Sequence, residues 1–155
     1  MLEFLHALSY AFFVVVFSFA SLTAREPVAV IPPDSEIAGE GPVRRYEWFR
    51  NLWKNKRTTW AKEVEAKQRA LVFLRDSITQ SWGDDLKGAF GNTKVANRGI
   101  SGDTTRGMLY RMPKDVLALN PTGVVLFMGT NDLEEGASPE EVAGNLELII
   151  KKLKS

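Results

Sequence analysis

Three apolar segments in the second half of the chain, at residues 71–74, 93–100 and 123–132, constrain its fold more than any other feature. The first and third, which contain LVFL and GVVLFM, show no alternation of apolar and polar residues. Such continuous runs are typical of strands covered on both faces, which is the usual environment of a parallel sheet. The weaker second run, TKVANRGI, ends like the other two in a polar or glycine-containing turn. The pattern therefore predicts three buried parallel strands.

Helical segments are expected between these strands. Residues 81–90 form one candidate, and residues 104–119 form a second, in which Pro113 is expected to break the helix. The alternation of strands and helices predicts an α/β fold with a doubly wound parallel sheet and right-handed crossovers.

The last predicted helix has the clearest start. Ser138 is its expected N-cap, Pro139 occupies the first position and Glu141 the third, so that the sequence forms a capping box. The apolar stripe of this helix consists of Val142, Leu146, Ile149 and Leu153.

Residues 1–24 are predicted to be a signal peptide or a membrane anchor. Residues 7–24 contain no charged side chain, and Ala20 and Ala24 are small residues that suit a cleavage site. Two features favour the anchor instead: residues before this run include no Lys or Arg, and residues 4–24 could span a bilayer, which takes about 20 residues. Either alternative exports the rest of the chain as a secreted or periplasmic protein, and the absence of cysteine does not contradict this.

Residues 25–43 are predicted to be a linker, and residues 44–155 a single domain. Proline fixes the backbone and removes hydrogen-bond donors, while glycine adds freedom, so a segment rich in both is expected to be a tether. The prolines and glycines are Pro27, Pro32, Pro33, Gly39, Gly41 and Pro42.

The segment after this linker combines Trp48, Trp53 and Trp60 with many basic residues. One interpretation is a nucleic-acid surface, in which aromatic rings stack on bases. The other is an amphipathic helix, because Tyr46, Phe49 and Trp53 recur at helical spacing. The whole chain has 20 Lys and Arg against 19 Asp and Glu, so no strong positive field supports a nucleic-acid partner. The amphipathic helix is therefore favoured.

Polar residues follow each predicted strand. Asp76 and Ser77 follow the first, Gly99 lies in the turn after the second, and Asn131 follows the third. Ligands of open parallel sheets bind outside the carboxyl ends of the strands. The set suits acyl transfer, in which Ser77 attacks a carbonyl carbon while backbone N–H groups and the Asn131 side chain donate to the oxyanion. Loss of one such donor typically costs ~3–4 kcal/mol in the transition state.

Each of these residues also has a purely structural interpretation. Asp76 and Ser77 could simply cap the next helix. Gly99 could serve only to permit a turn. Asn131 and Asp132 could form an Asx turn that closes the third strand.

No cofactor or metal is predicted. The glycines of NRGISGDTTRG do not have the spacing of a dinucleotide-binding fingerprint. Asp76, Asp103 and Asp132 are candidate metal ligands by residue type, but no histidine lies beside them and their spacing is not compact.

The three turns and their flanking residues resemble a known enzyme family. FLRDSITQSW, NRGISGDTTRGMLYRM and VVLFMGTNDLEEGASPEEVAGNLELI are similar, in this order, to the first three sequence blocks of the SGNH (GDSL-type) hydrolases. The second and third blocks most resemble the catalytic subunits of intracellular-type platelet-activating-factor acetylhydrolase and their bacterial relatives. The resemblance covers about residues 70–154.

This resemblance implies a fold, an activity and roles for single residues. The fold is a flavodoxin-like three-layer α/β/α sandwich with strand order 2-1-3-4-5. Ser77 matches the nucleophile, whose own N–H helps the oxyanion hole, and Gly99 and Asn131 match the other oxyanion donors. Asp76 is expected to order the serine turn. The implied reaction is hydrolysis of small acyl esters, such as acetyl esters of lipids or carbohydrates, without a cofactor.

Two departures from the family pattern concern the chemistry. The late D-x-x-H block that supplies the histidine base does not occur, and the single histidine, His6, lies in the predicted signal or anchor. A serine hydroxyl without such a base is a poor nucleophile at neutral pH. Arg75 stands where the family usually has glycine before Asp-Ser. A positive φ there would cost ~1–2 kcal/mol, whereas a negative φ would require space for the guanidinium.

A sheet without strands 4 and 5 leaves an apolar edge unpaired. The chain is therefore expected to be the N-terminal part of an SGNH esterase domain, from a truncated or split gene. Two alternatives stay open: a non-catalytic module that binds carbohydrates or acyl esters, and an interaction protein completed by another chain. The expected partners are a small ester substrate and, through a homo-oligomer, a second copy of the chain; membrane contact is expected only through residues 4–24.

Overall fold

The structure is a computed structural model that describes residues 31–155. The predicted signal peptide or anchor at residues 1–24 lies outside these described residues. Between residues 31 and 155, no helix is both long enough and apolar enough to cross a membrane.

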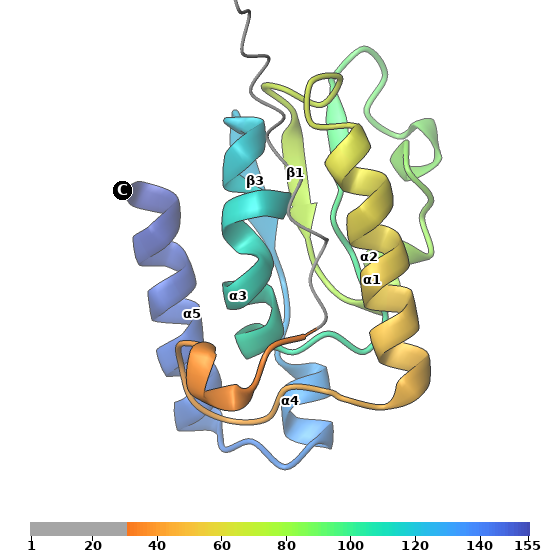
Figure 1. Ribbon diagram of the computed structural model, residues 1–155. Helices are drawn as coiled ribbons and strands as arrows, with labels where there is room; N and C mark the ends of the chain where they lie inside the picture. Colours follow the sequence, from red (N-terminus) through yellow and green to blue (C-terminus); the bar gives the residue numbers. More distant parts are fainter. Residues whose placement is uncertain (1–30) are drawn as a thin grey trace, which may run out of the picture.

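A three-stranded parallel sheet forms the centre of the domain (Figure 1). Strand β1 (Leu71–Leu74) lies between β2 (Val95–Asn97) and β3 (Gly123–Leu126). In the register of the sheet, Leu71 is level with Val95 and with Gly123. The three predicted strands are thus confirmed, and their order agrees with the order that the family resemblance implied. All three carboxyl ends lie at one edge of the sheet.

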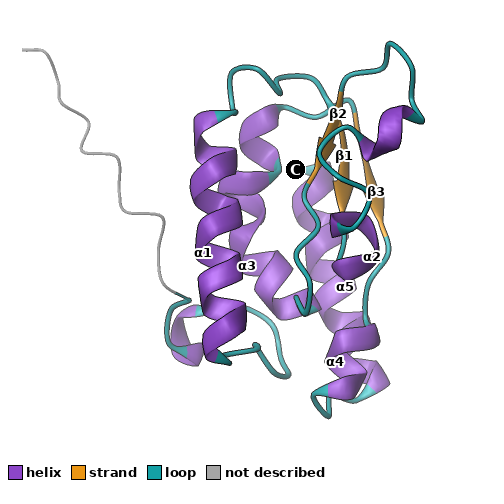
Figure 2. Cartoon of the chain, turned by 90° about the vertical axis from the view of Figure 1, so that its right-hand side faces the viewer, coloured by secondary structure: helices purple, strands orange, loops and turns teal. Residues whose placement is uncertain are grey.

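Two long helices, α3 (Thr105–Asp115) and α5 (Pro139–Lys154), cover one face of the sheet (Figure 2). A third helix, α1 (Glu47–Lys62), packs beside α3. The core between sheet and helices is apolar and fully enclosed. It consists of Ala70, Val72, Leu74, Ala96, Met108, Leu109, Met112, Val116, Leu119 and Ile149. The predicted α/β fold is therefore confirmed, and the sheet has three strands within residues 31–155.

The predicted amphipathic helix is α1, whose Phe49, Trp53 and Trp60 are buried. Ile31 and Ile37 pack into the same apolar cluster. Part of the expected linker is therefore a component of the domain, because these two side chains bury apolar surface against α1.

Residues 31–43 stay almost without regular secondary structure, apart from the short 3-10 helix η1 (Asp34–Glu36). The Arg106 side chain donates hydrogen bonds to the carbonyl oxygens of Asp34, Ile37 and Gly41 at 2.9, 3.0 and 2.7 Å. The carbonyl oxygens of Ile37 and Gly41 have no partner in a strand or helix, so Arg106 satisfies them. One arginine on α3 thus contributes three of the bonds that hold the segment in place.

The opposite face of β1 and β2 is covered by short helices and turns. Phe73, Leu86, Val95, Leu71, Trp82 and Phe90 form this second core. The helix predicted at residues 81–90 does not form; α2 (Ser77–Gln80) and the 3-10 helix η2 (Leu86–Gly88) occur instead. Leu86 and Lys87 have positive φ angles of 52° and 57°, which no continuous right-handed helix permits.

Helix α3 continues through Pro113 and ends at Asp115, so the predicted break at this proline does not occur. Proline removes one backbone donor, but its fixed φ is compatible with helical geometry. The 3-10 helix η3 (Leu117–Leu119) follows, and Asn120 closes it in the left-handed conformation. The predicted capping box of α5 is confirmed at Ser138 and Glu141.

Candidate active site

The loops that follow β1 and β2 are bound directly to each other. Ile100 N donates to the carbonyl oxygen of Arg75 at 3.2 Å, and Ser101 N donates to Gln80 Oε1 at 2.8 Å. These bonds fix the turn that carries Ser77 against the loop that carries Gly99.

Ser77 is the first residue of α2 and is exposed at the carboxyl end of β1. The buried Asp76 is the N-cap of this helix, and its carboxylate accepts a hydrogen bond from Ile78 N at 3.1 Å. This one hydrogen bond from Ile78 N to Asp76 both caps α2 and supports the turn that carries Ser77. The Ser77 hydroxyl makes no hydrogen bond to another residue between 31 and 155, so it is open to a ligand.

Gly99 brings the second loop into backbone contact with the serine turn. A Cβ atom at this position would lie 2.5 Å from Gln80 N and 2.8 Å from the carbonyl oxygen of Asp76. No side chain fits there without moving one loop away from the other. The Gly99 N–H itself donates to Asn97 Oδ1 at 2.9 Å, so it is engaged inside the protein.

Asn97 organises these two loops, although sequence analysis did not single it out. Its side-chain amide donates to the carbonyl oxygens of Thr79 at 2.6 Å and Gly83 at 2.7 Å, while its Oδ1 accepts from Gly99 N. The side chain is buried. The sequence VANRG places a polar residue at the end of a buried strand, and this pattern could have identified Asn97.

Asn131 joins the third loop to the second. It lies on α4 (Thr130–Glu134), which begins after Gly129 in a turn with a φ of 121° that favours glycine. Asn131 Nδ2 donates to the carbonyl oxygen of Asp103 at 3.0 Å. Only one of its two amide hydrogens is needed for this bond. Ser77, Gly99 and Asn131 therefore lie on three loops in which each loop is hydrogen-bonded to the next.

Asp132, next to Asn131, is committed to a structural role. Its carboxylate accepts hydrogen bonds from the N–H, at 2.9 Å, and the hydroxyl of Thr105 at the start of α3. Burial raises the pKa of this carboxyl, and the bonds from Thr105 oppose that shift. The Asx turn proposed from sequence is replaced by a link between α4 and α3.

Asp103 is fully buried and pairs with Arg111 at 2.6 Å. Burial raises the pKa of Asp103 to about 6, against the attraction of the Arg111 guanidinium. The candidate metal ligands Asp76, Asp103 and Asp132 thus each bind a different protein donor. In the described part of the chain, no group of three or more His, Cys, Asp or Glu side chains is placed to hold a metal.

Arg75 does not strain the backbone, because it is not among the residues between 31 and 155 that have a positive φ. Its side chain leaves the strand end and crosses to β3, where Nε donates to the carbonyl oxygen of Phe127 at 3.2 Å. The guanidinium lies 4.3 Å from the centre of the Phe127 ring and 5.9 Å from that of Trp82. The replacement of glycine is accommodated by space at the edge of the sheet.

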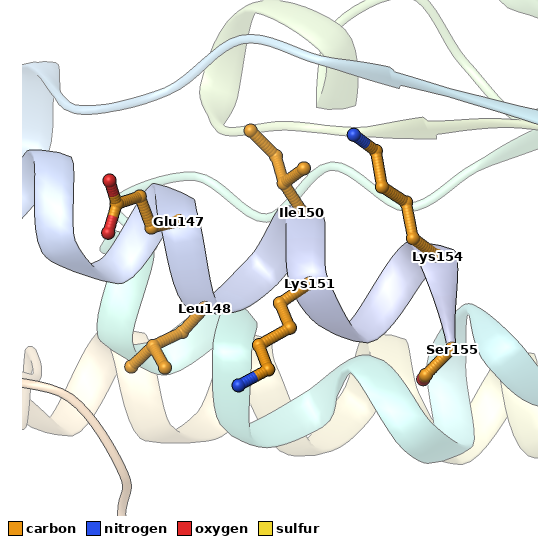
Figure 3. A pocket seen from close by; sticks show the side chains of 6 residues that line it. All are labelled: Glu147, Leu148, Ile150, Lys151, Lys154 and Ser155. Atoms are coloured by element: carbon orange, nitrogen blue, oxygen red, sulfur yellow. The ribbon is translucent and has the colours of Figure 1, made fainter.

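No histidine occurs between residues 31 and 155, so this part of the chain supplies no imidazole base. The geometry positions a nucleophile and hydrogen-bond donors, and no histidine of the described residues accepts the proton of Ser77. A separate hollow lies along the second half of α5, where Ile150 and Lys154 point to one side of the helix and Leu148 and Lys151 to the other (Figure 3). It is remote from the three loops, because α5 starts near α4 and runs away from that end of the sheet (Figure 1).

Comparison with known proteins gives consistent results. Residues 73–155 match the GDSL-like Lipase/Acylhydrolase family. The platelet-activating factor acetylhydrolase IB subunit alpha2 of Homo sapiens is 31% identical over 102 residues, which make up 64% of this chain and 44% of that relative. Esterase TesA of Pseudomonas aeruginosa is 36% identical over 62 residues, or 40% of this chain and 31% of the relative. The chain thus spans less than half the length of these curated relatives.

Solved structures show the same similarity. A GDSL-like lipase from Bacteroides thetaiotaomicron superposes with a TM-score of 0.56 and 30% identity, over 63% of this chain and 52% of that one. A putative acylhydrolase from Bacteroides fragilis superposes with a TM-score of 0.55 and 26% identity, over 63% of this chain and 51% of that one.

Proposed function

Because the chain belongs to the GDSL-like lipase/acylhydrolase family, the SGNH hydrolases, we propose that it carries the nucleophile and oxyanion part of an ester hydrolase site. The proposed substrates are small acyl esters, such as acetyl esters, of lipids or carbohydrates. The observation that supports the proposal most directly is the exposed Ser77 at the tip of β1. The loop of Gly99 is bonded to the serine turn, and Asn131 is bonded to the loop of Gly99.

In the proposed reaction the Ser77 oxygen attacks the ester carbonyl carbon, and the carbonyl oxygen becomes an oxyanion. Ser77 N–H is free for that oxygen because the first N–H groups of a helix have no partner within it. The second amide hydrogen of Asn131 is the other donor that we assign. Gly99 N–H contributes only if it exchanges its bond to Asn97 Oδ1. The alcohol then leaves, and water hydrolyses the acyl-serine.

The proton of Ser77 must pass to a base, and residues 31–155 contain no histidine for this purpose. By analogy with serine proteases that lack a triad residue, donors and binding alone leave ~10³–10⁴-fold acceleration over water. We therefore expect slow acylation by these residues alone.

A fluorophosphonate probe tests the proposal, because it labels a serine that is nucleophilic and is flanked by oxyanion donors. Slow labelling is expected in the parent chain, and it is expected to disappear in Ser77→Ala. Ser81→Ala is a matched control, since Ser81 lies near the same short helix with its hydroxyl bonded to the Ile78 carbonyl oxygen. Equal labelling of parent and Ser77→Ala would contradict the assignment.

The second candidate function is a non-catalytic binding module that uses the same loops. The observation that favours it is the absence of a histidine among the described residues. A parent chain that binds acyl esters but shows no labelling of Ser77 would support this candidate.

A further inference from the structure

Two large aromatic rings are exposed together at the start of α1. Tyr46 is 55% exposed and Trp48 is 50% exposed. Their rings are stacked, with centroids 6.5 Å apart and an angle of 16° between the planes. Trp48 also packs edge-on against the buried Phe49 ring, at 5.8 Å and 84°, which fixes its orientation. Large aromatic rings usually bury most of their surface, so a rigid exposed pair is typical of a binding surface.

Arg44 fixes this aromatic pair to the helix that carries Asn131. Its guanidinium lies 5.9 Å from the centre of each ring. The same guanidinium pairs with Glu134 at 2.8 Å and with Glu135 at 2.7 Å, at the end of α4. Arg44 itself is buried, so the pairing is held in a defined geometry.

The aromatic pair also borders the loop of the candidate oxyanion hole. A Cβ atom at Gly102 would lie 2.7 Å from Trp48 Cη2 and 2.8 Å from Arg44 Nη1. The next residue, Asp103, provides the carbonyl oxygen that Asn131 binds. Figure 1 shows the first turn of α1 at the same end of the sheet as α4. The exposed rings therefore lie at the same end of the sheet as the loops that carry Gly99 and Asn131.

The chemistry of this surface favours a sugar ring. One side of a pyranose presents C–H groups that pack on a flat aromatic face, while its hydroxyl groups need polar partners nearby. Tyr46 and Trp48 supply the flat face, and Glu134, whose side chain is 67% exposed, supplies a polar partner at its border. Arg44 is already paired with both Glu134 and Glu135, so its guanidinium offers no unpaired positive charge to the phosphate group of a lipid. A flexible acyl chain gains nothing from a rigid flat surface.

We propose that Tyr46 and Trp48 form a subsite for a pyranose ring of an O-acylated saccharide, which presents its ester to Ser77. The inference rests on the proposed function, since it names the substrate class of the same site.

The test is a calorimetric titration of the full chain, with Ser77→Ala present to prevent turnover, using O-acetylated xylo-oligosaccharides as the probe. Trp48→Ala is expected to lower the affinity about tenfold, which corresponds to ~1.4 kcal/mol. Trp48→Phe is expected to retain most of the affinity because it keeps an aromatic face. Leu148→Ala, which removes an exposed apolar side chain on α5, is the control and is expected to change nothing.

Several outcomes would overturn the subsite. These are the same affinity in Trp48→Ala as in the parent, no binding of the saccharide, or Trp48-dependent binding of a short-chain phospholipid in its place. The labelling experiment on Ser77 separates this failure from that of the proposed function. Labelling without saccharide binding removes only the subsite, whereas saccharide binding without labelling keeps the subsite and contradicts hydrolysis.

Discussion

Gly99 is the residue whose size matters most for the geometry of the candidate site. It allows the backbone of one loop to touch the backbone of the serine turn, and Asn97 then bonds the two together. The role is steric, and it is independent of whether the Gly99 N–H ever donates to an oxyanion.

We expect Gly99→Ala to lower the free energy of unfolding by about 1–3 kcal/mol, because the added methyl group overlaps backbone atoms that cannot move separately. Fluorophosphonate labelling of Ser77 should slow in the same variant, as the serine turn shifts. Urea unfolding and the labelling rate are the two measurements.

Gly144→Ala provides the matched control. Gly144 lies within α5, and a Cβ atom added there meets no other atom within 4 Å. Alanine is better than glycine in a helix interior by about 0.5–1 kcal/mol, so this variant should be slightly more stable than the parent. Similar effects of the two substitutions would refute the steric role of Gly99.

At the level of secondary-structure elements, one side chain ties three segments together. Asn145 on α5 donates to the carbonyl oxygen of Glu40 at 2.8 Å and to Thr105 Oγ1 at 3.0 Å, and it accepts from Glu40 N at 3.1 Å. It thereby connects α5 to the start of α3 and to residues 31–43. Asn145 is buried, so these bonds are shielded from water.

Asn145→Ala is expected to destabilise the protein by about 1–3 kcal/mol, since it leaves buried partners without hydrogen bonds. Amide hydrogen exchange should also become faster within residues 31–43, which lose their attachment to α5. The control is Glu147→Ala on the exposed side of the same helix. Unchanged exchange in residues 31–43 would show that the Asn145 hydrogen bonds are not needed to hold this segment.

The elements that could be predicted from sequence are those whose formation is determined by a few consecutive residues. The LVFL and GVVLFM runs and the capping box at Ser138 each carry their pattern within a few residues, and the structure confirms them. Positions 77, 99 and 131 could be placed on one rim because parallel strands end at the same edge.

What the sequence did not reveal depends on contacts between distant residues. Arg106 binds carbonyl groups about 70 positions away in a segment that, by its own composition, predicts only a tether. Asn97 and the aromatic pair at the start of α1 likewise acquire their roles through loops that meet only in the folded chain.

For the molecule as a whole, one face of β3 is uncovered. Phe73 on β1 is 5% exposed, under the Phe90 ring at 5.0 Å. Val125, its partner in β3, is 39% exposed, and Phe127 is 62% exposed. Within the described residues, β3 also has no strand on its outer side. The outer edge of β3 thus presents unpaired backbone groups beside exposed apolar side chains, and such an edge is a template for pairing with another chain.

We expect the isolated chain to self-associate through β3 as its concentration rises. Val125→Lys should shift it toward the monomer, because a charge on the open face opposes strand pairing. Size-exclusion chromatography with light scattering measures this, and Leu133→Lys on the exposed side of α4 is the control. A parent chain that stays monomeric at all concentrations would contradict the expectation and also count against completion of the sheet by another copy.

The contact between Arg75 and Phe127 also bears on aggregation. GVVLFM is an uncharged apolar window, and residues 116–131 contain no charged side chain at all. Segments of this composition seed cross-β assembly, and proteins commonly place charged gatekeeper residues beside them. Arg75 brings its guanidinium from the end of β1 to Phe127, the exposed aromatic ring of that window. The arginine that departs from the family's glycine thus has the position of a gatekeeper residue, and it reaches that position through the fold and not through the neighbouring sequence.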